Sequence, residues 1–256
     1  VEQRRAGLGP LHLMARPYPA AFHAALHRGV PGDVDFYRRV CAGASRVLEL
    51  GAGEGRVSRA LAADGLEVVG VDLHDGLLEL ARAAGGGPSY LHADARTLDL
   101  GETFDRVIAP FGTAYCMLTE DDLAAMLARG AAHLAEGGLL TFDGYAADAF
   151  HAQGGPDGRD EEERLGPVEV EGRRYDVYEE SDWTRASQRI DAHYRYVPAD
   201  GGAELRAVLP QRYLLSTQLE GLLRRSGLEL LVLHGGFDQH AYDAESERLI
   251  VTAHCA

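Results

Sequence analysis

Residues 47–56 read VLELGAGEGR, an apolar run that leads into glycines at every second position, Gly51, Gly53 and Gly55. Glycine allows a tight turn and lets backbone N–H groups come within contact distance of a ligand where a helix begins. The dinucleotide-binding pattern G-x-G-x-x-G does this for a pyrophosphate, but Arg56 stands where that pattern has its third glycine. The stretch predicts a strand, a turn approached by a ligand and a helix, with a purely structural turn as the alternative.

Three acidic residues stand close to the expected strand ends. Glu49 interrupts the apolar run two residues before Gly51. Asp72 ends the next apolar run about 20 residues further on, the separation at which an acid reaches a ribose diol. Asp94 follows a third run, within HADA at residues 92–95. These acids favour a ligand-binding turn over a structural one.

From residue 46 onward, short apolar runs alternate with amphipathic stretches. Strands are expected at 46–50, 67–71, 90–92, 104–109, 138–142, 228–233 and 248–253, and helices at 54–63, 76–84, 120–134 and 218–226. Asp75 and Thr119 are candidate N-caps, and Thr217 with Glu220 forms a candidate capping box. This alternation predicts an α/β protein with a parallel sheet between two layers of helices. Because no helix separates the last two strands, the sheet is expected to end in an antiparallel pair.

The pattern changes between residues 146 and 209. Residues 146–164 are rich in turn formers and charges, which is typical of a mobile loop. From 167 to 209 the apolar residues recur with a period of two, which predicts an antiparallel insertion with a hairpin turn at Glu171 and Gly172. Residues 1–45 are mostly compatible with helix, including one helix near 34–42. We therefore expect a helical lid (1–45), an α/β domain (46–145 and 210–256) and a β insertion (146–209).

Composition and charge argue against several classes of protein. The 256 residues carry a net charge of −15 and scattered arginines, so we expect no nucleic-acid partner. Three widely spaced cysteines without the spacing of metal ligands indicate a reduced, cytoplasmic protein with no metal site. No apolar run reaches the roughly 18–20 residues that cross a bilayer, so we expect no membrane segment.

Taken together, these features resemble the class I S-adenosylmethionine-dependent methyltransferases over residues 33–143 and 211–254. VLELGAGEGR matches their E/D-x-G-x-G-x-G motif, VVGVD at 68–72 their acid-ended second strand, and HADA the acidic site after the third. FDRVIAPFGTAY at 104–115 is similar to the strand and loop that face the methyl donor. The resemblance implies a doubly wound, Rossmann-like sheet of seven mostly parallel strands with an antiparallel final strand, and S-adenosyl-L-methionine as cofactor.

By position, the resemblance places the donor at the ends of these strands. Gly51 and Gly53 would pass the methionine half, Asp72 would accept hydrogen bonds from the ribose hydroxyls, and Asp94 would bind the adenine amino group. The residues implied to hold the cofactor are Glu49, Gly51, Ala52, Gly53, Asp72, Leu73, Asp94, Ala95, Ala109 and Phe111.

Within that family, the resemblance is to small-molecule methyltransferases of secondary metabolism, including aminosugar and glycine N-methyltransferases. The fourth strand is not followed by Asn/Asp-Pro-Pro-Tyr/Phe, which argues against nucleobase and protein-glutamine acceptors. Tyr18 and Asp143 are the catalytic candidates, and Phe111, Tyr115 and Tyr145 are the candidate substrate contacts. As alternatives, Tyr18 could staple the lid, Phe111 could only pack, and Asp143 could cap a loop.

The expected reaction is methyl transfer to nitrogen, ahead of oxygen or carbon, of a small-molecule acceptor, with positioning supplying most of the rate. Two alternatives remain open. A nicotinamide-dependent oxidoreductase would share the glycines and Asp72 but leaves Asp94 unexplained, and a non-catalytic S-adenosylmethionine-binding scaffold would lack a closed acceptor cavity. The lid and the insertion are expected to close a pocket over the acceptor, although the insertion could instead form the interface of a homodimer.

Overall fold

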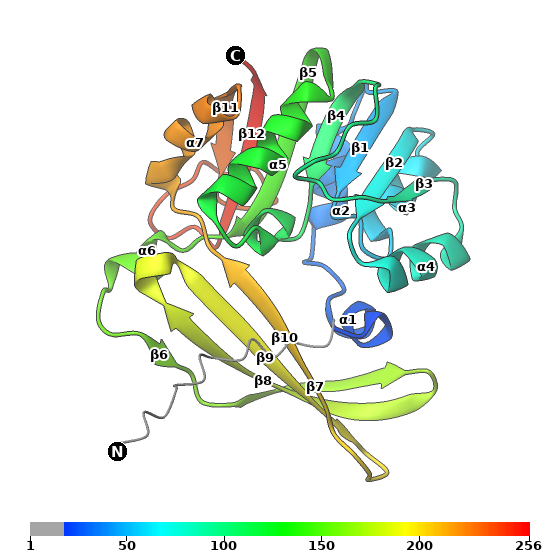
Figure 1. Ribbon diagram of the computed structural model, residues 1–256, viewed down its shortest axis with the longest axis vertical. Coiled ribbons are helices and arrows are strands. Elements are labelled where there is room, and N and C mark those ends of the chain that lie inside the picture. Colours follow the sequence, from blue (N-terminus) through cyan, green and yellow to red (C-terminus); the bar gives the residue numbers. More distant parts are fainter. Residues whose placement is uncertain (1–17) are drawn as a thin grey trace, which may run out of the picture.

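The computed structural model describes residues 18–256, so residues 1–17 of the expected lid lie outside the described part of the chain. The larger sheet has seven strands in the order β11-β12-β5-β4-β1-β2-β3 (Figure 1). Its strands are β1 (Arg46–Leu50), β2 (Glu67–Asp72), β3 (Ser89–His92), β4 (Phe104–Ala109), β5 (Leu134–Tyr145), β11 (Leu228–His234) and β12 (Arg248–Cys255). β12 is antiparallel to its neighbours β5 and β11, and the other pairs are parallel. This confirms the predicted fold class.

The order of the strands determines where a ligand can bind. β1 lies inside the sheet, with β2 and β3 on one side and β4 and β5 on the other. In an open α/β sheet, such a reversal of strand order opens a crevice at the carboxyl ends of the strands. Gly51 follows β1 directly, and Asp72 and Ala109 are the last residues of β2 and β4.

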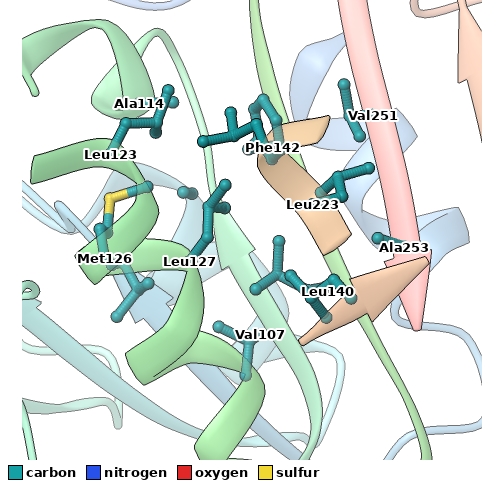
Figure 2. Packing of buried hydrophobic residues seen from close by; sticks show 14 of the residues in the cluster. Val107, Ala114, Leu123, Met126, Leu127, Leu140, Phe142, Leu223, Val251 and Ala253 are labelled. Atoms are coloured by element: carbon teal, nitrogen blue, oxygen red, sulfur yellow. The ribbon is translucent and has the colours of Figure 1, made fainter. Parts of the chain in front are cut away.

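Helices cover both faces of this sheet. They are α2 (Asp33–Val40), α3 (Arg56–Ala63), α4 (Asp75–Ala84), α5 (Glu120–Ala132) and α7 (Leu219–Arg225). Successive strand side chains point to opposite faces, so Val47 belongs to the core that includes α2 and α3, whereas Leu48 belongs to the core that includes α5 and α7. Figure 2 shows the second of these cores, in which Met126 and Leu127 of α5 face Phe142 of β5.

Two predicted helix caps differ from the structure. His74, not Asp75, caps α4: its Nδ1 accepts the Leu77 N–H while its Nε2 donates to the carbonyl of Tyr18. α7 follows a short 3-10 turn in which the side chain of Gln218 accepts the N–H of a preceding leucine, so the predicted Thr217–Glu220 box is wrong. In both places, a side chain that can reach a distant or preceding backbone group replaces the predicted cap.

The boundary between α5 and β5 also differs from the prediction. α5 begins under the cap of Thr119, as predicted, but ends at Ala132, and β5 already starts at Leu134. β5 pairs with β4 first at Leu134 and, after an interruption, again from Leu139. The interruption contains Gly137 at φ 73°, so the glycine that suggests a helix end marks an irregularity within a strand.

The smaller sheet is the predicted antiparallel insertion. It contains β6 (Gly158–Arg159), β7 (Glu163–Val170), β8 (Arg173–Thr184), β9 (Arg189–Pro198) and β10 (Leu205–Arg212), in the order β10-β9-β8-β6 with β7 also paired to β8. Glu171 and Gly172 link β7 to β8 at φ 52° and 76°, the two left-handed residues of a type I′ hairpin turn. The predicted loop at 146–164 contains α6 (Asp148–Ala152), where Asp148 accepts hydrogen bonds from Ser216 and Tyr242.

The described part of the lid connects the two sheets. In Figure 1, α1 (Ala20–Leu26) lies between α4 and the smaller sheet. Phe22 packs edge-on against Tyr175 and Tyr196, with ring centroids 5.0 and 4.9 Å apart. On the α4 side, the helix comes so close that a Cβ on Gly76 would lie 3.1 Å from Ala20. None of the helices within residues 18–256 combines the length and the apolarity that a membrane span requires.

Candidate active site

The three glycines after β1 are required for different structural reasons. Gly51, Gly53 and Gly55 all have left-handed backbone, at φ 71°, 55° and 78°. A Cβ on Gly51 would collide with the side chain of Thr113, and one on Gly55 with the hydroxyl of Tyr90. A Cβ on Gly53 would meet no atom of the described residues within 4 Å. Packing therefore requires the outer two glycines, while Gly53 faces open space that a ligand can occupy.

Asp72 and Asp94 lie beside this turn, after β2 and β3. The Asp72 carboxylate accepts the N–H of Gly53 and the N–H of His74, each at 2.8 Å, which fixes it against the glycine turn. Asp94 accepts from the Arg96 guanidinium through both oxygens, at 3.0 and 2.6 Å. These hydrogen bonds hold the pKa of Asp94 below its usual value. An adenine amino group would share this carboxylate with Arg96.

Glu49 lies on the face of β1 that α3 covers. It is only 2 % exposed, and Ser58 of α3 donates a hydrogen bond to its carboxyl group. Burial raises the pKa of Glu49 to about 8, so the side chain is mostly protonated at neutral pH. A cation placed beside Glu49 would stabilise its ionised form.

A cavity of about 600 Å³ extends from the glycine turn to the smaller sheet. This volume lies within the range of small-molecule sites, about 300–1,000 Å³. Beyond Phe111, the cavity is bounded by His23 and His27 of α1 and by Tyr194 and Gln211 of the smaller sheet. Most of the predicted site residues line it, namely Tyr18, Glu49, Gly51, Ala52, Gly53, Asp72, Leu73, Asp94, Ala95, Phe111 and Tyr145.

Three of the predicted site residues, Ala109, Tyr115 and Asp143, lie behind the cavity wall instead. Ala109 is 1 % exposed within β4, and Tyr115 is fully buried in the core under α5. The Tyr115 ring packs over Gly144, and its hydroxyl donates to the carbonyl of Tyr145 at 2.7 Å. In this structure Tyr115 packs behind the cavity wall and Ala109 ends its strand there, so neither side chain lines the cavity. Their predicted ligand contacts stay predictions.

Asp143 also lies behind the wall, 1 % exposed. One of its oxygens accepts the hydroxyl of Tyr37 at 2.5 Å and the N–H of Phe111 at 2.9 Å. Burial raises the pKa of Asp143 to about 6. Phe111 has left-handed backbone at φ 56°, so Asp143 holds the turn that places Phe111 in the cavity. In this structure Asp143 holds the loop, which is the alternative to a catalytic contact, and the predicted catalytic role stays a prediction.

His23 and His27 are cavity residues that the sequence analysis does not single out. His23 lies in α1 and His27 is the C-cap of this helix, one turn further on, with the ring centroids 4.5 Å apart. Burial lowers the pKa of each to about 4, so both rings are neutral at pH 7. Their spacing of four residues is the sequence signal for a shared helix face. The smaller sheet determines which way that face points, and this contact is distant in sequence.

A series of hydroxyl groups reaches His27 and favours one tautomer of its ring. The Tyr196 hydroxyl donates to the carbonyl of Phe22, so it accepts from the hydroxyl of Tyr18. The Tyr18 proton is then not available to His27, so the His27 Nε2, 3.2 Å away, donates and its Nδ1 carries a lone pair. Burial and the Tyr196 hydrogen bond keep the pKa of Tyr18 above its usual value. Tyr18 therefore remains a phenol that orients the imidazole.

Arg56 explains why the turn departs from the dinucleotide-binding pattern. Its two terminal nitrogens donate to the two oxygens of Asp33 at 2.9 and 2.6 Å. Asp33 begins α2 and also accepts the N–H groups of Val30 and Val34. A Cβ on Gly29 would collide with the guanidinium, so the backbone there lies directly on it. Arg56 thus ties the connection between α1 and α2 to the first turn of α3.

Comparison with known proteins gives the class of this domain. Residues 47–138 match the family model described as a methyltransferase domain. Relatives include the demethylmenaquinone methyltransferase of Clavibacter sepedonicus, 42 % identical over 26 % of this chain and 29 % of the relative. The dTDP-4-amino-2,3,4,6-tetradeoxy-D-glucose N,N-dimethyltransferase of Saccharopolyspora spinosa is 34 % identical over 39 % of this chain and 40 % of the relative. The cypemycin N-terminal methyltransferase of a Streptomyces species is 28 % identical over 80 % of this chain and 81 % of the relative. This chain thus spans less than half the length of the first two of these relatives.

A solved structure extends the similarity to most of the chain. The CcbJ methyltransferase of Streptomyces caelestis has a TM-score of 0.76 and 26 % identity, over 90 % of this chain and 98 % of that one. The matching fold, the glycine turn and the family match together show that this chain carries the class I S-adenosylmethionine-dependent methyltransferase domain. S-adenosyl-L-methionine is the cofactor of this domain.

Proposed function

We propose that this protein transfers the methyl group of S-adenosylmethionine to an amino nitrogen of a small metabolite such as an amino sugar. The observation that carries the proposal is that two neutral imidazoles, His23 and His27, face the same cavity as Gly51 and Asp72. Relatives named for N-methylation of an amino sugar and of a peptide N-terminus support nitrogen as the accepting atom.

In this proposal the donor lies along the glycine turn. Its ribose hydroxyls donate to Asp72, its adenine lies beside Asp94, and its methionine part passes Gly53. The ammonium group of the methionine part approaches Glu49, which lines this end of the cavity. That cation would favour the ionised form of Glu49 and so offset the cost of its burial.

The lid (1–45) and the insertion (146–209) would cover the acceptor, while the α/β domain (46–145 and 210–256) would hold the donor. Tyr194, Leu209 and Gln211 of the smaller sheet line the same cavity as the donor-side residues. This shared cavity supports an enzyme over a non-catalytic scaffold, because it would place an acceptor against the donor. A homodimer formed through the insertion stays a prediction.

The amine must reach the donor as the free base. Its lone pair forms the new N–C bond while the S–C bond breaks, which leaves a methylated ammonium product and S-adenosylhomocysteine. A ring whose pKa is about 4 is a weak base, so His23 and His27 would orient the amine by accepting its N–H hydrogen bonds. The ammonium form of the acceptor loses its proton to solvent before binding. The value of kcat/KM should therefore rise with pH until the acceptor is fully converted to the free amine.

The test compares a 4-amino-4,6-dideoxyhexose with the matching 4-hydroxy sugar in the presence of labelled S-adenosylmethionine. We expect an N-methylated product from the amine alone. His27→Gln should lower kcat/KM by about tenfold, the effect of one lost hydrogen bond of about 1.4 kcal/mol. His254→Gln, at the far end of β12, is the matched control and should leave kcat/KM unchanged. Methylation of the hydroxy sugar in place of the amine would contradict the proposal.

A further inference from the structure

A second cavity, of about 270 Å³, adjoins the first at Tyr145, which lines both. Its lining residues come from the end of β5 and from α6 on one side and from the smaller sheet on the other. Figure 1 shows α6 beside the smaller sheet. Phe150, Ser181, Trp183 and Ile190 line it. The proposed methyl transfer uses none of these four residues. The volume is below that of a typical whole-ligand site and suits one ring of a larger molecule.

Two hydrogen-bond donors in the wall of this cavity are unpaired. The indole nitrogen of Trp183 and the hydroxyl of Tyr145 are shielded from solvent and have no hydrogen-bond partner within residues 18–256. Burying a donor without a partner is unfavourable, so native structures rarely leave one. Both residues line the cavity, so a ligand there that carries acceptor oxygens would satisfy these groups once the two side chains turn toward it.

The aromatic walls indicate that this ligand is a neutral ring. Trp183 and Phe150 meet edge to face with centroids 5.8 Å apart. The guanidinium of Arg185 already lies over the Phe150 ring at 4.3 Å, which disfavours a cationic ligand beside it. A saturated ring with several hydroxyl groups fits better, because its C–H face packs on aromatic rings while its oxygens accept from the two unpaired donors. Its own hydroxyl groups can donate to Asp160, which is exposed in the wall of the cavity.

The two cavities lie along one face of the same strand pair. Tyr194, which lines the first cavity, pairs with Glu179, whereas Ile190 and Trp183 of the second cavity form a pair further along the two strands. Four residues separate the pairs on each strand, which corresponds to about 13 Å at about 3.3 Å per residue. The side chains of both pairs point to the same side of the sheet, because residues at even spacing share a face.

Building on the proposed function, we infer that the second cavity binds a pyranose-sized, uncharged ring at the distal end of the acceptor. The amino group of the same molecule then lies in the first cavity beside His23 and His27. The protein would select acceptors in which a hydroxylated ring is linked to the amine, over amines that lack this ring.

Trp183 makes the second cavity directly observable, because it is the one tryptophan of the chain. The probes are ω-aminoalkyl β-D-glucopyranosides of increasing linker length, and the matched ω-methoxyalkylamines lack only the pyranose. With S-adenosylhomocysteine bound, we expect a glucoside of suitable length to shift the Trp183 emission in a saturable way, and the methoxyalkylamines to leave it unchanged. The same protein with labelled S-adenosylmethionine reports methyl transfer separately.

Two variants of β9 provide the control for this binding. Ile190→Phe fills the second cavity and should weaken the glucoside by about tenfold or more. Val197→Phe makes a comparable enlargement on the opposite face of the same strand and should not. An emission that no glucoside changes, or equal affinity in the Ile190→Phe variant, overturns the inference. If amines are methylated but no glucoside changes the Trp183 emission, only this inference fails. If Trp183 responds but no amine is methylated, the proposed function fails.

Discussion

Glu49 is a single acid in the buried centre of β1, where the strand of a parallel sheet ordinarily carries an apolar side chain. Its hydrogen bond from Ser58 satisfies one oxygen but leaves the group mostly protonated, because burial raises the pKa of Glu49 to about 8. The position is costly for folding alone. It becomes useful when a cation lies beside it, as the ammonium of the proposed donor would.

Glu49→Gln tests this protonation state without a ligand. Because the folded-state pKa lies above the usual value of 4.5, the wild type loses stability as pH rises from about 4.5 to about 8, and glutamine has no such group. The free energy of unfolding of the variant relative to wild type should therefore increase with pH, by up to about 1.4 kcal/mol per pH unit. Urea denaturation between pH 5 and 9 measures this, with the exposed Glu67→Gln as control. A difference that does not change with pH would mean that Glu49 is ionised in the folded protein.

At the scale of elements, the turn between β1 and α3 contains glycines required by packing and a glycine that faces the cavity. Alanine substitutions distinguish these two roles. Gly51→Ala places a Cβ against Thr113 in left-handed backbone and should lower the free energy of unfolding by roughly 2–5 kcal/mol. Gly53→Ala meets only the backbone cost, about 1–2 kcal/mol, because its Cβ enters the cavity. Gly53→Ala should instead lower the affinity for S-adenosylhomocysteine by about tenfold or more, as measured by calorimetry. The assignment of the donor to this turn fails if Gly53→Ala binds as tightly as wild type.

The docking of α1 should depend on pH through its histidines. The pKa of His27 is lowered by burial from 6.5 to about 4, so the unfolded chain takes up a proton that the folded protein does not. Stability from burying the neutral ring is complete above pH 6.5 and is lost as pH falls toward 4. The free energy of unfolding of wild type relative to His27→Gln should fall by up to about 1.4 kcal/mol per pH unit in this window. Urea denaturation measures this, with His254→Gln as control; parallel pH profiles of wild type and His27→Gln would refute it.

The elements of the fold could be predicted from the sequence because their periodicity is local. The hairpin turn at Glu171 and Gly172 needs two left-handed residues, and the sequence supplies a glycine there. The early start of β5 could not be predicted, because Leu134 pairs with Phe104, which is distant in sequence. In the sequence alone, Gly137 is typical of a residue that ends a helix. His74 caps α4 for a similar reason, since the carbonyl of Tyr18 fixes its ring from another segment.

The donor side and the acceptor side of the site also differ in how far the sequence predicts them. Asp72 and Asp94 could be predicted because acids at the ends of parallel strands meet at one edge of a sheet. His23 and His27 could not, because α1 has its orientation only through packing against the smaller sheet. The sequence shows two histidines four residues apart and nothing about what they face.

At the scale of the whole molecule, the cavity combines a donor half from the larger sheet with an acceptor half from α1 and the smaller sheet, inside a chain of net charge −15. The charged residues that line it are unequal in sign. The carboxylates are Glu54, Asp72, Asp94 and Asp122, because burial keeps Glu49 mostly protonated, and the guanidinium groups are Arg56, Arg96 and Arg248. The charges that line the cavity and the net charge of the whole chain therefore both favour cationic ligands.

This field should distinguish the methyl donor from its product. S-adenosylmethionine carries a sulfonium charge that S-adenosylhomocysteine lacks, and the two are otherwise nearly identical in shape. Salt shortens the reach of the field from about 10 Å at 0.1 M to about 3 Å at 1 M. Raising sodium chloride across that range should weaken the donor by about three- to tenfold and the product by clearly less, because only the donor loses a net attraction. Calorimetry with each ligand in the absence of an acceptor measures both, and the product serves as the control for general effects of salt. Equal weakening of the two would mean that the sulfonium does not experience the charge of the protein, and the electrostatic preference for cationic ligands would then be wrong.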